Sequence, residues 1–413
     1  MGATPPPTGR PETRTRLRHG GAALAAVLLV AGCSAGGDTR GPADLAVPGP
    51  TPASSSASRD HHAGPRDGVG PAPAGRPLRR GERFLDMAMA APYTPSAPTG
   101  RGTDDYRCFL LDPDLDEDAF ITGLDVLPGN REVVHHVILF RVPPEATGSA
   151  VAQDMAEEGP GWTCFGGSGV GGAGAALDDA PWLGAWAPGG GEQVLAGDVG
   201  IPLTAGSQVV LQVHYNLLAG RQPDTTATRL RLADGGADLA ELDTVLLPAP
   251  VELPCRPRHD DGELCDRTAS VADAQARFGM AAQTANYLHL LCGRQEPGPV
   301  QRCRRTVEQP TTVRAAAGHM HLLGRSIRIE ANPGTRRART LLDVGTWDFD
   351  DQGARPVEPV RLRPGDSVEV TCRHDQSLRD VLPAFEGQPD RYVVWGDGTT
   401  DEMCLGMLMV TRP

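Results

Sequence analysis

Short apolar or alternating segments recur from about residue 81 onward, and they constrain the fold of this chain more than any other feature. Examples are residues 119–128 (AFITGLDVLP), 132–142 (EVVHHVILFRV), 207–218 (SQVVLQVHYNLL) and 404–413 (CLGMLMVTRP). Runs of this length, rich in β-branched residues and bounded by turn residues, predict β-strands. Only residues 271–287 look weakly helical. We therefore expect an all-β fold, with a hairpin turn at PGD (364–366) between 359–363 and 367–372.

The length of this strand-rich region predicts two domains. About 330 residues exceed what one hydrophobic core usually organises. We expect two consecutive antiparallel β-sandwiches, spanning residues 81–238 and 239–413. Residues 33–80 precede them and are rich in Pro, Gly, Ala and Ser. Such a composition buries little apolar surface, so this segment is expected to be a disordered tether.

Residues 1–32 have the pattern of an export signal. A basic stretch containing Arg10 and Arg18 is followed by an apolar stretch from Ala22 to Val30. That stretch is too short to cross a bilayer as a permanent helix. It ends in LVAGC, which is similar to a bacterial lipobox and predicts Cys33 as the lipidated mature N-terminus. The alternative is an ordinary secretory signal with a chance cysteine.

A lipid anchor would place the protein in the cell envelope. It would hold the chain on the outside of the cytoplasmic membrane or on an outer membrane, with that membrane as a partner. Export also permits disulfides. Without Cys33, eight of the nine cysteines remain, an even number. Cys255, Cys265, Cys292 and Cys303 cluster in one segment, and three pairings of these four are open.

Charge and composition exclude several function classes. The net charge is −13, and all 39 basic residues are arginine. The absence of lysine excludes a P-loop lysine, a Schiff-base lysine and a lysine general base. An acidic chain without a basic stripe also has little capacity to bind nucleic acid.

Six residues have the side chains and the surroundings of metal ligands. They are His135 and His136 in EVVHHVILF, His214 in QVVLQVHYNL, His319 and His321 in GHMHLLG, and Met403 in TTDEMCLGMLMV. Side chains alternate along a strand, so His319 and His321 share a face and suit one ion. His135 and His136 would point to opposite faces unless the strand bulges there. Imidazole binds several metals, whereas a thioether favours cuprous copper.

These blocks resemble the copper type II, ascorbate-dependent monooxygenases, the family of peptidylglycine α-hydroxylating monooxygenase and dopamine β-monooxygenase. The resemblance rests on YRC (106–108), HHVILF (135–140), LQVHY (211–215), HMHLLG (319–324) and DEMC (401–404), in that order. It extends from about Tyr106 to Val410. The family fold that it implies is two jelly-roll sandwiches, in agreement with the strand pattern.

The resemblance also implies a cofactor and a reaction. It assigns an electron-storing copper to His135, His136 and His214, and a copper that binds O2 beside the substrate to His319, His321 and Met403. The reductant would be ascorbate or a similar one-electron donor, and the product a hydroxylated C–H bond. Tyr106 and Gln212 match positions that orient the first set of imidazoles. The implied disulfides are Cys108–Cys164 and Cys372–Cys404.

The sequence departs from the peptide-amidating members at the substrate positions. Where those enzymes hold a peptide carboxylate with polar residues, this chain has Ala317, Leu405 and Met407. An apolar trio cannot pair with a carboxylate, so we expect a small neutral or apolar organic substrate. The alternative function is a lipid-anchored protein that binds or delivers copper without turnover. Two complete ligand sets favour the enzyme, because a carrier needs only one.

Overall fold

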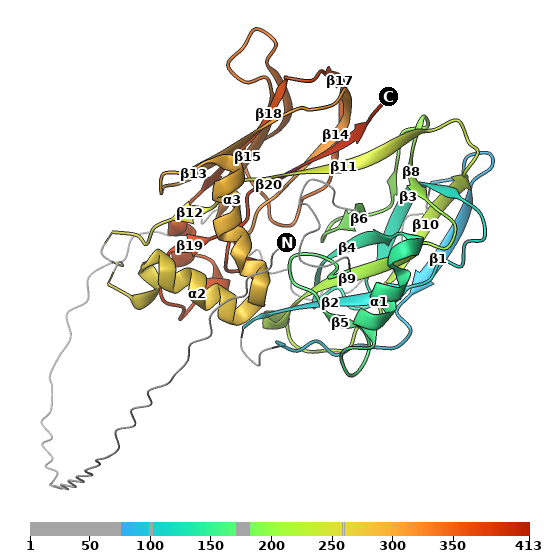
Figure 1. Ribbon diagram of the computed structural model, residues 1–413. Coiled ribbons are helices and arrows are strands. Elements are labelled where there is room, and N and C mark those ends of the chain that lie inside the picture. Colours follow the sequence, from blue (N-terminus) through green and yellow to red (C-terminus); the bar gives the residue numbers. More distant parts are fainter. Residues whose placement is uncertain (1–75, 99–101, 171–181, 258, 260) are drawn as a thin grey trace, which may run out of the picture. The chain divides into compact units, whose positions relative to one another are not determined.

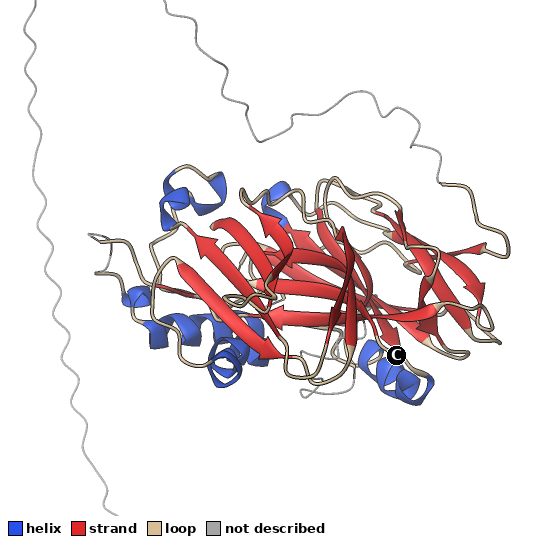
Figure 2. Cartoon of the chain, turned by 90° about the horizontal axis from the view of Figure 1, so that it is seen from above, coloured by secondary structure: helices blue, strands red, loops and turns tan. Residues whose placement is uncertain are grey.

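The computed structural model describes residues 76–413 apart from 99–101, 171–181, 258 and 260 (Figure 1). Figure 2 shows that strands make up most of this part of the chain, with the helices at its periphery. The fold is therefore mostly β, with several sheets that form sandwich-like layers. The predicted signal peptide, the lipidation site Cys33 and nearly all of the predicted tether lie outside the described residues.

The strands β1 to β10 and helix α1 form the N-terminal half. They are β1 (Arg83–Ala88), β2 (Asp104–Leu111), β3 (Ala119–Leu127), β4 (Val134–Val142), α1 (Thr147–Asp154), β5 (Trp162–Thr163), β6 (Trp182–Trp186), β7 (Gln193–Val194), β8 (Val199–Leu203), β9 (Gln208–Asn216) and β10 (Ala227–Asp234). One layer has the order β1-β10-β3-β8, with β7 beside β3, and the other has the order β5-β2-β9-β4-β6.

The strands β11 to β20 and helices α2 and α3 form the C-terminal half. They are β11 (Ala240–Pro248), β12 (Glu252–Leu253), α2 (Arg267–Phe278), α3 (Thr284–Cys292), β13 (Val300–Thr306), β14 (Thr311–His319), β15 (Gly324–Ala331), β16 (Arg339–Val344), β17 (Arg355–Leu362), β18 (Ser367–His374), β19 (Val393–Val394) and β20 (Leu405–Thr411). The layers are β11-β20-β14-β17 and β13-β18-β15-β16, and β12 pairs with β19.

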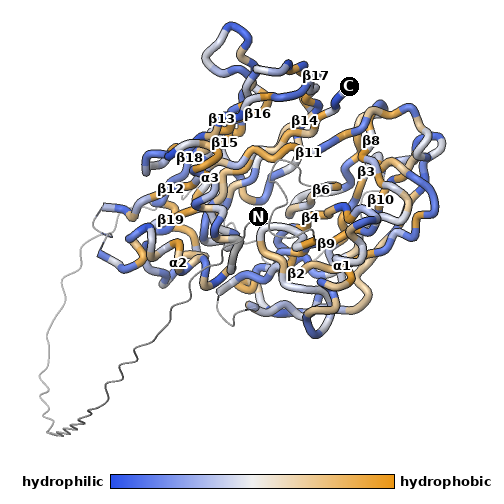
Figure 3. The backbone as a smooth tube through the Cα atoms, in the orientation of Figure 1, coloured by the Kyte–Doolittle hydropathy of each residue, from blue (hydrophilic) through white to orange (hydrophobic). Residues whose placement is uncertain are grey.

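Alternation of side chains explains why these runs form strands between two layers. In β9, Val209, Leu211 and Val213 are fully buried in the core between the two N-terminal sheets. Gln212 and His214 point to the opposite face of the same strand. Figure 3 shows the apolar course of β4 and β9 through the middle of this half. The sequence therefore presents His214 on the face that the other layer does not cover.

The two halves are joined edge to edge. Strands β8 and β11 pair in parallel over two positions, Val199 with Ala240 and Gly200 with Glu241. The sheet is consequently nine-stranded and continues across the predicted boundary between residues 238 and 239. That boundary stays a proposal, as does the jelly-roll topology. Trp182 of β6 also packs against the C-terminal core.

Two local predictions can be compared with the structure. The hairpin predicted at PGD is wrong, because β17 pairs with β14 whereas β18 pairs with β13 and β15. The turn therefore carries the chain from one layer to the other. The helical pattern at 271–287 corresponds to α2 and α3, which extend further on both sides. No helix in the described residues is long and apolar enough to span a bilayer.

Four disulfides cross-link the described chain. The structure contains both pairs that the resemblance implies, Cys108–Cys164 and Cys372–Cys404. Of the three pairings left open for the other four cysteines, it contains Cys255–Cys265 and Cys292–Cys303. Four disulfides indicate an extracytoplasmic protein, because reducing compartments keep thiols free.

Candidate metal centre

A β-bulge brings His135 and His136 together. Strand β4 pairs with β9 in register on both sides of the pair, but the register shifts between Val134 and His136, so that His136 lies opposite His214. The extra residue in β4 is His135, and a bulge of this kind turns adjacent side chains towards one side. The condition under which both histidines can serve one ion is therefore met.

Three imidazole nitrogens converge at this bulge. The Nδ1 atom of His135 lies 3.1 Å from that of His136 and 3.1 Å from that of His214. The Nδ1 atoms of His136 and His214 are 3.3 Å apart. All three side chains are buried. Three nitrogens bound to one ion at about 2.0–2.1 Å, with roughly tetrahedral angles, have this spacing. His135, His136 and His214 therefore form a candidate metal site.

The protonation of these imidazoles also favours a cation at their centre. Burial, and then the neighbouring His214, lower the pKa of His135 and His136 well below the usual value. His214 donates from Nε2 to a carboxylate oxygen of Asp104 at 2.9 Å, so its Nδ1 carries a lone pair. With all three imidazoles neutral, an ion at the centre can take a lone pair from each Nδ1 atom. Three imidazoles suit copper, zinc, iron and nickel alike.

Asp104 is the carboxylate that orients His214. Burial alone would raise its pKa, but hydrogen bonds from His214 and Thr399 hold the pKa well below the usual range. The backbone N–H and the hydroxyl of Thr399 donate to the same oxygen at 3.1 and 2.5 Å. Asp104 belongs to β2, whereas Thr399 lies in the loop before β20. One carboxylate thus connects a histidine of the first set to the segment that leads to Met403.

Tyr106 supports the same imidazole from its face. Its ring stacks on that of His214, with the ring centres 4.0 Å apart and the planes 14° from parallel. Its hydroxyl donates to the backbone carbonyl of Asp397 at 2.8 Å. The predicted orienting position at Tyr106 therefore does contact a ligand of the first set.

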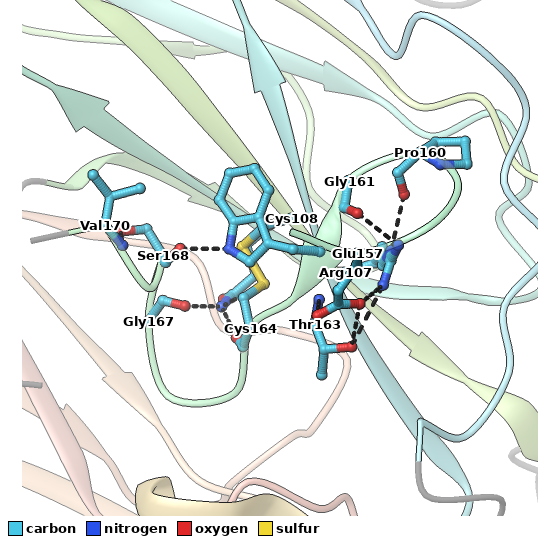
Figure 4. The surroundings of a disulfide bond; sticks show 12 residues. Arg107, Cys108, Glu157, Pro160, Gly161, Thr163, Cys164, Gly167, Ser168 and Val170 are labelled. Atoms are coloured by element: carbon cyan, nitrogen blue, oxygen red, sulfur yellow. Dashed lines mark hydrogen bonds and ion pairs between the residues drawn. A yellow bond between two sulfur atoms is a disulfide. The ribbon is translucent and has the colours of Figure 1, made fainter. Parts of the chain in front are cut away.

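Gln212, the other predicted orienting residue, faces the Cys108–Cys164 disulfide. Its side-chain amide donates to the carbonyls of Cys164 and Gly167 at 2.8 and 3.1 Å. No imidazole is among its hydrogen-bond partners in the described part of the chain. Figure 4 shows this disulfide and the loop that follows it. Gln212 fixes that loop and so has a role other than the one expected from the sequence.

His319 and His321 stand at the end of β14, with their ring centres 5.1 Å apart. His319 donates from Nδ1 to the side-chain oxygen of Gln352 at 2.5 Å. His321 donates from Nδ1 to the backbone carbonyl of Asp401 at 3.3 Å. In both rings the proton therefore resides on Nδ1. The Nε2 atom of each ring then carries a lone pair that can bind a metal ion. In the described residues, Nε2 of His321 is buried without a hydrogen-bond partner.

Glu402 holds the segment of Met403 against His321. Its carboxylate is fully buried and accepts from the backbone N–H groups of His321, Leu323 and Met403 at 3.1, 2.6 and 3.2 Å. Further along, Leu405 of β20 lies opposite His319 of β14. Glu402 therefore ties the backbone of Met403 to that of His321, whereas the second ligand set, His319, His321 and Met403, stays a prediction.

The two sets of histidines adjoin each other. The rings of His136 and His319 are 5.7 Å apart between centres, in an edge-on arrangement. Phe349, from the connection between β16 and β17, stacks on His135 with the ring centres 4.6 Å apart. The same connection supplies Gln352. One loop of the C-terminal half therefore contacts both sets and covers the first.

Three further histidines of the described chain have other surroundings. His289 lies 2.7 Å from a carboxylate oxygen of Glu252, and His374 lies 3.3 Å from one of Glu402. His259 is exposed. None of the three belongs to the described cluster of His135, His136 and His214.

Several residues at the site were missed by sequence reasoning. Asp104, Phe349 and Gln352 come from segments without a recognisable pattern, and they approach the ligands only through the tertiary fold. Asp401 and Glu402 are the first two residues of the DEMC block, and both are buried. Their position beside Met403 was a signal that could have identified them.

Comparisons with known proteins add no assignment. No protein-family model matches the chain, and no curated protein matches it. Three weak structural matches are a fucolectin from the serum of Morone saxatilis, striped bass (8% identity, TM-score 0.18, 81% of this chain and 97% of that one), the coconut allergen cocosin (10%, 0.14, 80% and 86%), and procruciferin, an 11S globulin from Brassica napus (11%, 0.16, 82% and 83%). TM-scores this low carry no argument, so the resemblance to copper monooxygenases stays an interpretation of the sequence.

Proposed function

We propose that this protein is a copper-dependent monooxygenase. It would use O2 and an external one-electron reductant of the ascorbate type to hydroxylate a C–H bond of a small organic substrate. The observation that carries the proposal is the approach of two donor sets, whose nearest rings, His136 and His319, are 5.7 Å apart. Insertion of one oxygen atom from O2 requires two electrons from outside the substrate bond, and two neighbouring one-electron sites supply that number.

The chain's own residues prepare both sets for a cation. His135, His136 and His214 would hold one ion, and His319, His321 and Met403 the other. Copper bound there would supply one-electron redox chemistry, and the soft thioether of Met403 favours its cuprous state. Asp104, Gln352 and the carbonyl of Asp401 fix the proton of their imidazole on the nitrogen that faces away from the ion.

The surroundings of His319 favour a neutral or apolar substrate. Ala317 lies two residues before His319, opposite Met407 of β20, and Leu405 lies opposite His319 itself. All three apolar residues are buried. None of these three side chains offers a cation to a carboxylate, in keeping with a substrate class different from that of the peptide-amidating enzymes.

Copper analysis of a ligand variant tests the two-site assignment. We expect His214→Ala to halve the copper content of the purified, disulfide-intact protein and to abolish turnover. His259→Ala, at an exposed histidine, is the control and should leave both unchanged. If His214→Ala still bound as much copper as the unaltered protein, the assignment of His214 would be incorrect.

Oxygen uptake distinguishes the enzyme from a copper carrier. The copper-loaded protein should consume O2 with ascorbate only when a suitable apolar substrate is present. Met403→Ala should abolish this uptake while copper remains bound at the three-histidine site. Metal retention without substrate-dependent uptake, across a panel of apolar compounds, would favour the alternative of a copper-binding or copper-delivery protein.

A further inference from the structure

An arginine-lined cavity lies in the C-terminal half, away from the candidate metal centre. Its volume is about 450 Å³, and it is formed by the β15–β16 connection and by the end of β17 with the turn that follows. Its charged lining residues are Arg336, Arg337, Arg339, Arg361, Arg363 and Asp366. This cavity, called the arginine pocket below, therefore has five cationic side chains and one carboxylate.

Hydrogen bonds fix the two turns that form the arginine pocket. The backbone N–H of Asn332 donates to the carbonyl of Ser367 at 2.7 Å, and the N–H of Ser367 donates to the side-chain oxygen of Asn332 at 3.0 Å. Asp366, which is buried, accepts from the N–H of Arg363 at 2.9 Å and pairs with Arg337 at 2.6 Å. The arginine-bearing turns are therefore held side by side, and the single carboxylate is used within the scaffold.

The charge of the arginine pocket is not neutralised by the protein. Within the part of the chain that the structure describes, no carboxylate lies within ion-pair distance of Arg336, Arg339, Arg361 or Arg363. All four side chains are exposed. The chain as a whole has 52 acidic and 39 basic residues. A cavity lined by charges of one sign attracts a ligand of the opposite sign.

The arginine pocket is remote from the histidines. Arg361 and Leu362 of β17 lie opposite Thr312 and Thr311 at the start of β14. His319 is at the other end of that strand, roughly 24 Å away at the usual rise per strand residue. The arginine pocket is thus separate from the proposed reaction.

We propose that the arginine pocket binds a phosphate group. The planar guanidinium fork matches the oxygens of phosphate in pairs, and several forks around one cavity can contact oxygens on different sides of a single group. The group is either a free phosphate or the headgroup phosphate of an anionic lipid. In both cases Arg361 and Arg363, from the β17 end, and Arg336 and Arg339, from the opposite turn, contact the same anion.

Binding to phosphate and to vesicles tests this proposal. The full chain with Cys33→Ser removes any contribution of a lipid anchor. Calorimetric titration with inorganic phosphate, against chloride of equal ionic strength, should show saturable binding. The double variant Arg361→Gln/Arg363→Gln should weaken it by about tenfold. The control is Arg325→Gln/Arg328→Gln, which removes the same charge from exposed positions of β15 outside the arginine pocket.

Vesicles identify the source of the phosphate. Sedimentation with phosphatidylglycerol vesicles, but not with phosphatidylcholine vesicles, that is reversed by free phosphate and lost in the pocket variant, would assign a lipid headgroup. Phosphate binding without sedimentation would assign a free phosphate. If neither phosphate nor vesicles bind, or if the pocket and control variants weaken binding equally, the proposal fails. The arginines would then serve only to protect the edge strand β17 from pairing.

Discussion

Asp104 shows how much of the candidate site depends on one carboxylate. A single buried oxygen accepts from His214 and twice from Thr399, so it sets a ligand's proton and also fixes the loop before Met403. A carboxylate behind a metal-binding imidazole raises the basicity of the ligand and fixes its orientation. The metal affinity of the three-histidine set should therefore depend on Asp104 itself.

We predict that Asp104→Asn weakens metal binding at the three-histidine set by about 10- to 100-fold. An amide can accept from His214, but it carries no charge to stabilise a cation beside the ring. Competition with a chelator of known affinity would measure the change. Asp105→Asn is the matched control, because Asp105 is equally buried in β2 but accepts from Tyr93 and Ser96 instead. Equal loss of affinity in both variants would contradict this role.

Asp397 makes stability depend on pH. Burial, and then the charge of Asp401, raise its pKa from 3.8 to about 7. The folded state therefore holds a proton that the unfolded state releases near pH 4. This contribution to stability is complete below pH 3.8 and is lost as the pH rises through 7.

Asp397→Asn removes that dependence. We predict that, between pH 4 and pH 8, the free energy of unfolding of the variant rises relative to the unaltered protein by about 2–4 kcal/mol. Urea denaturation at both pH values measures the difference, and the titration of the histidines cancels because both proteins share it. Asp401→Asn should instead destabilise at both pH values, since it breaks the 2.8 Å ion pair with Arg277. A constant difference for Asp397→Asn would refute the prediction.

At the scale of elements, the strands were predictable and their partners were not. The period-two pattern identified β3, β4, β9 and β20 within a few residues. It also indicated that His135 and His136 could bind one ion only if the strand bulges there, and the register shift in β4 is such a bulge. The partners of β17 and β18 could not be derived, because a Pro-Gly turn is the same whether the chain returns to its own sheet or crosses to another.

A disulfide ties strand β18 to the residue that follows Met403, just before β20. It joins Cys372 and Cys404 across 32 residues, and both are fully buried. We predict that Cys372→Ala/Cys404→Ala lowers the free energy of unfolding by about 3–4 kcal/mol and loosens the copper that we propose Met403 holds. Copper content after dialysis, with sulfur scattering in X-ray absorption, would detect this.

A second disulfide provides the control for that prediction. Cys255→Ala/Cys265→Ala opens a bridge of sequence separation 10 in a segment without proposed ligands. It should lower stability by about 3 kcal/mol but leave the sulfur scattering unchanged. If copper content and sulfur scattering were both unaltered in the Cys372 and Cys404 variant, Met403 would not need this disulfide to hold copper.

At the scale of the whole molecule, the sequence did not predict the contacts at the site between the N-terminal and C-terminal halves. Asp104 and Thr399 are 295 positions apart, and Tyr106 and Asp397 are 291 apart. No periodicity in either segment encodes such a pairing, because it depends on how two folded sheets meet. The parallel pairing of β8 with β11 is of the same kind. Motif order predicted six ligand positions, and the structure brings His135, His136 and His214 of these together in one cluster. Only the assembled halves show which residues support that cluster.

Localisation is also a property of the whole chain. We predict that Cys33→Ser releases the protein from the membrane fraction into the soluble fraction, with its fold intact. Fractionation followed by near-ultraviolet circular dichroism would measure both. Ser34→Ala, at the neighbouring position, should remain with the membrane. Retention of the Cys33 variant on the membrane would exclude a lipid on that cysteine as its anchor.

The register shift in β4 has an implication for how such centres arise. One additional residue in an interior strand can turn two neighbouring side chains to the same face while the flanking residues keep their pairing. A plain sandwich could thus acquire a chelating corner in a single genetic step, and a designer could copy it by lengthening one strand by a single residue opposite a histidine.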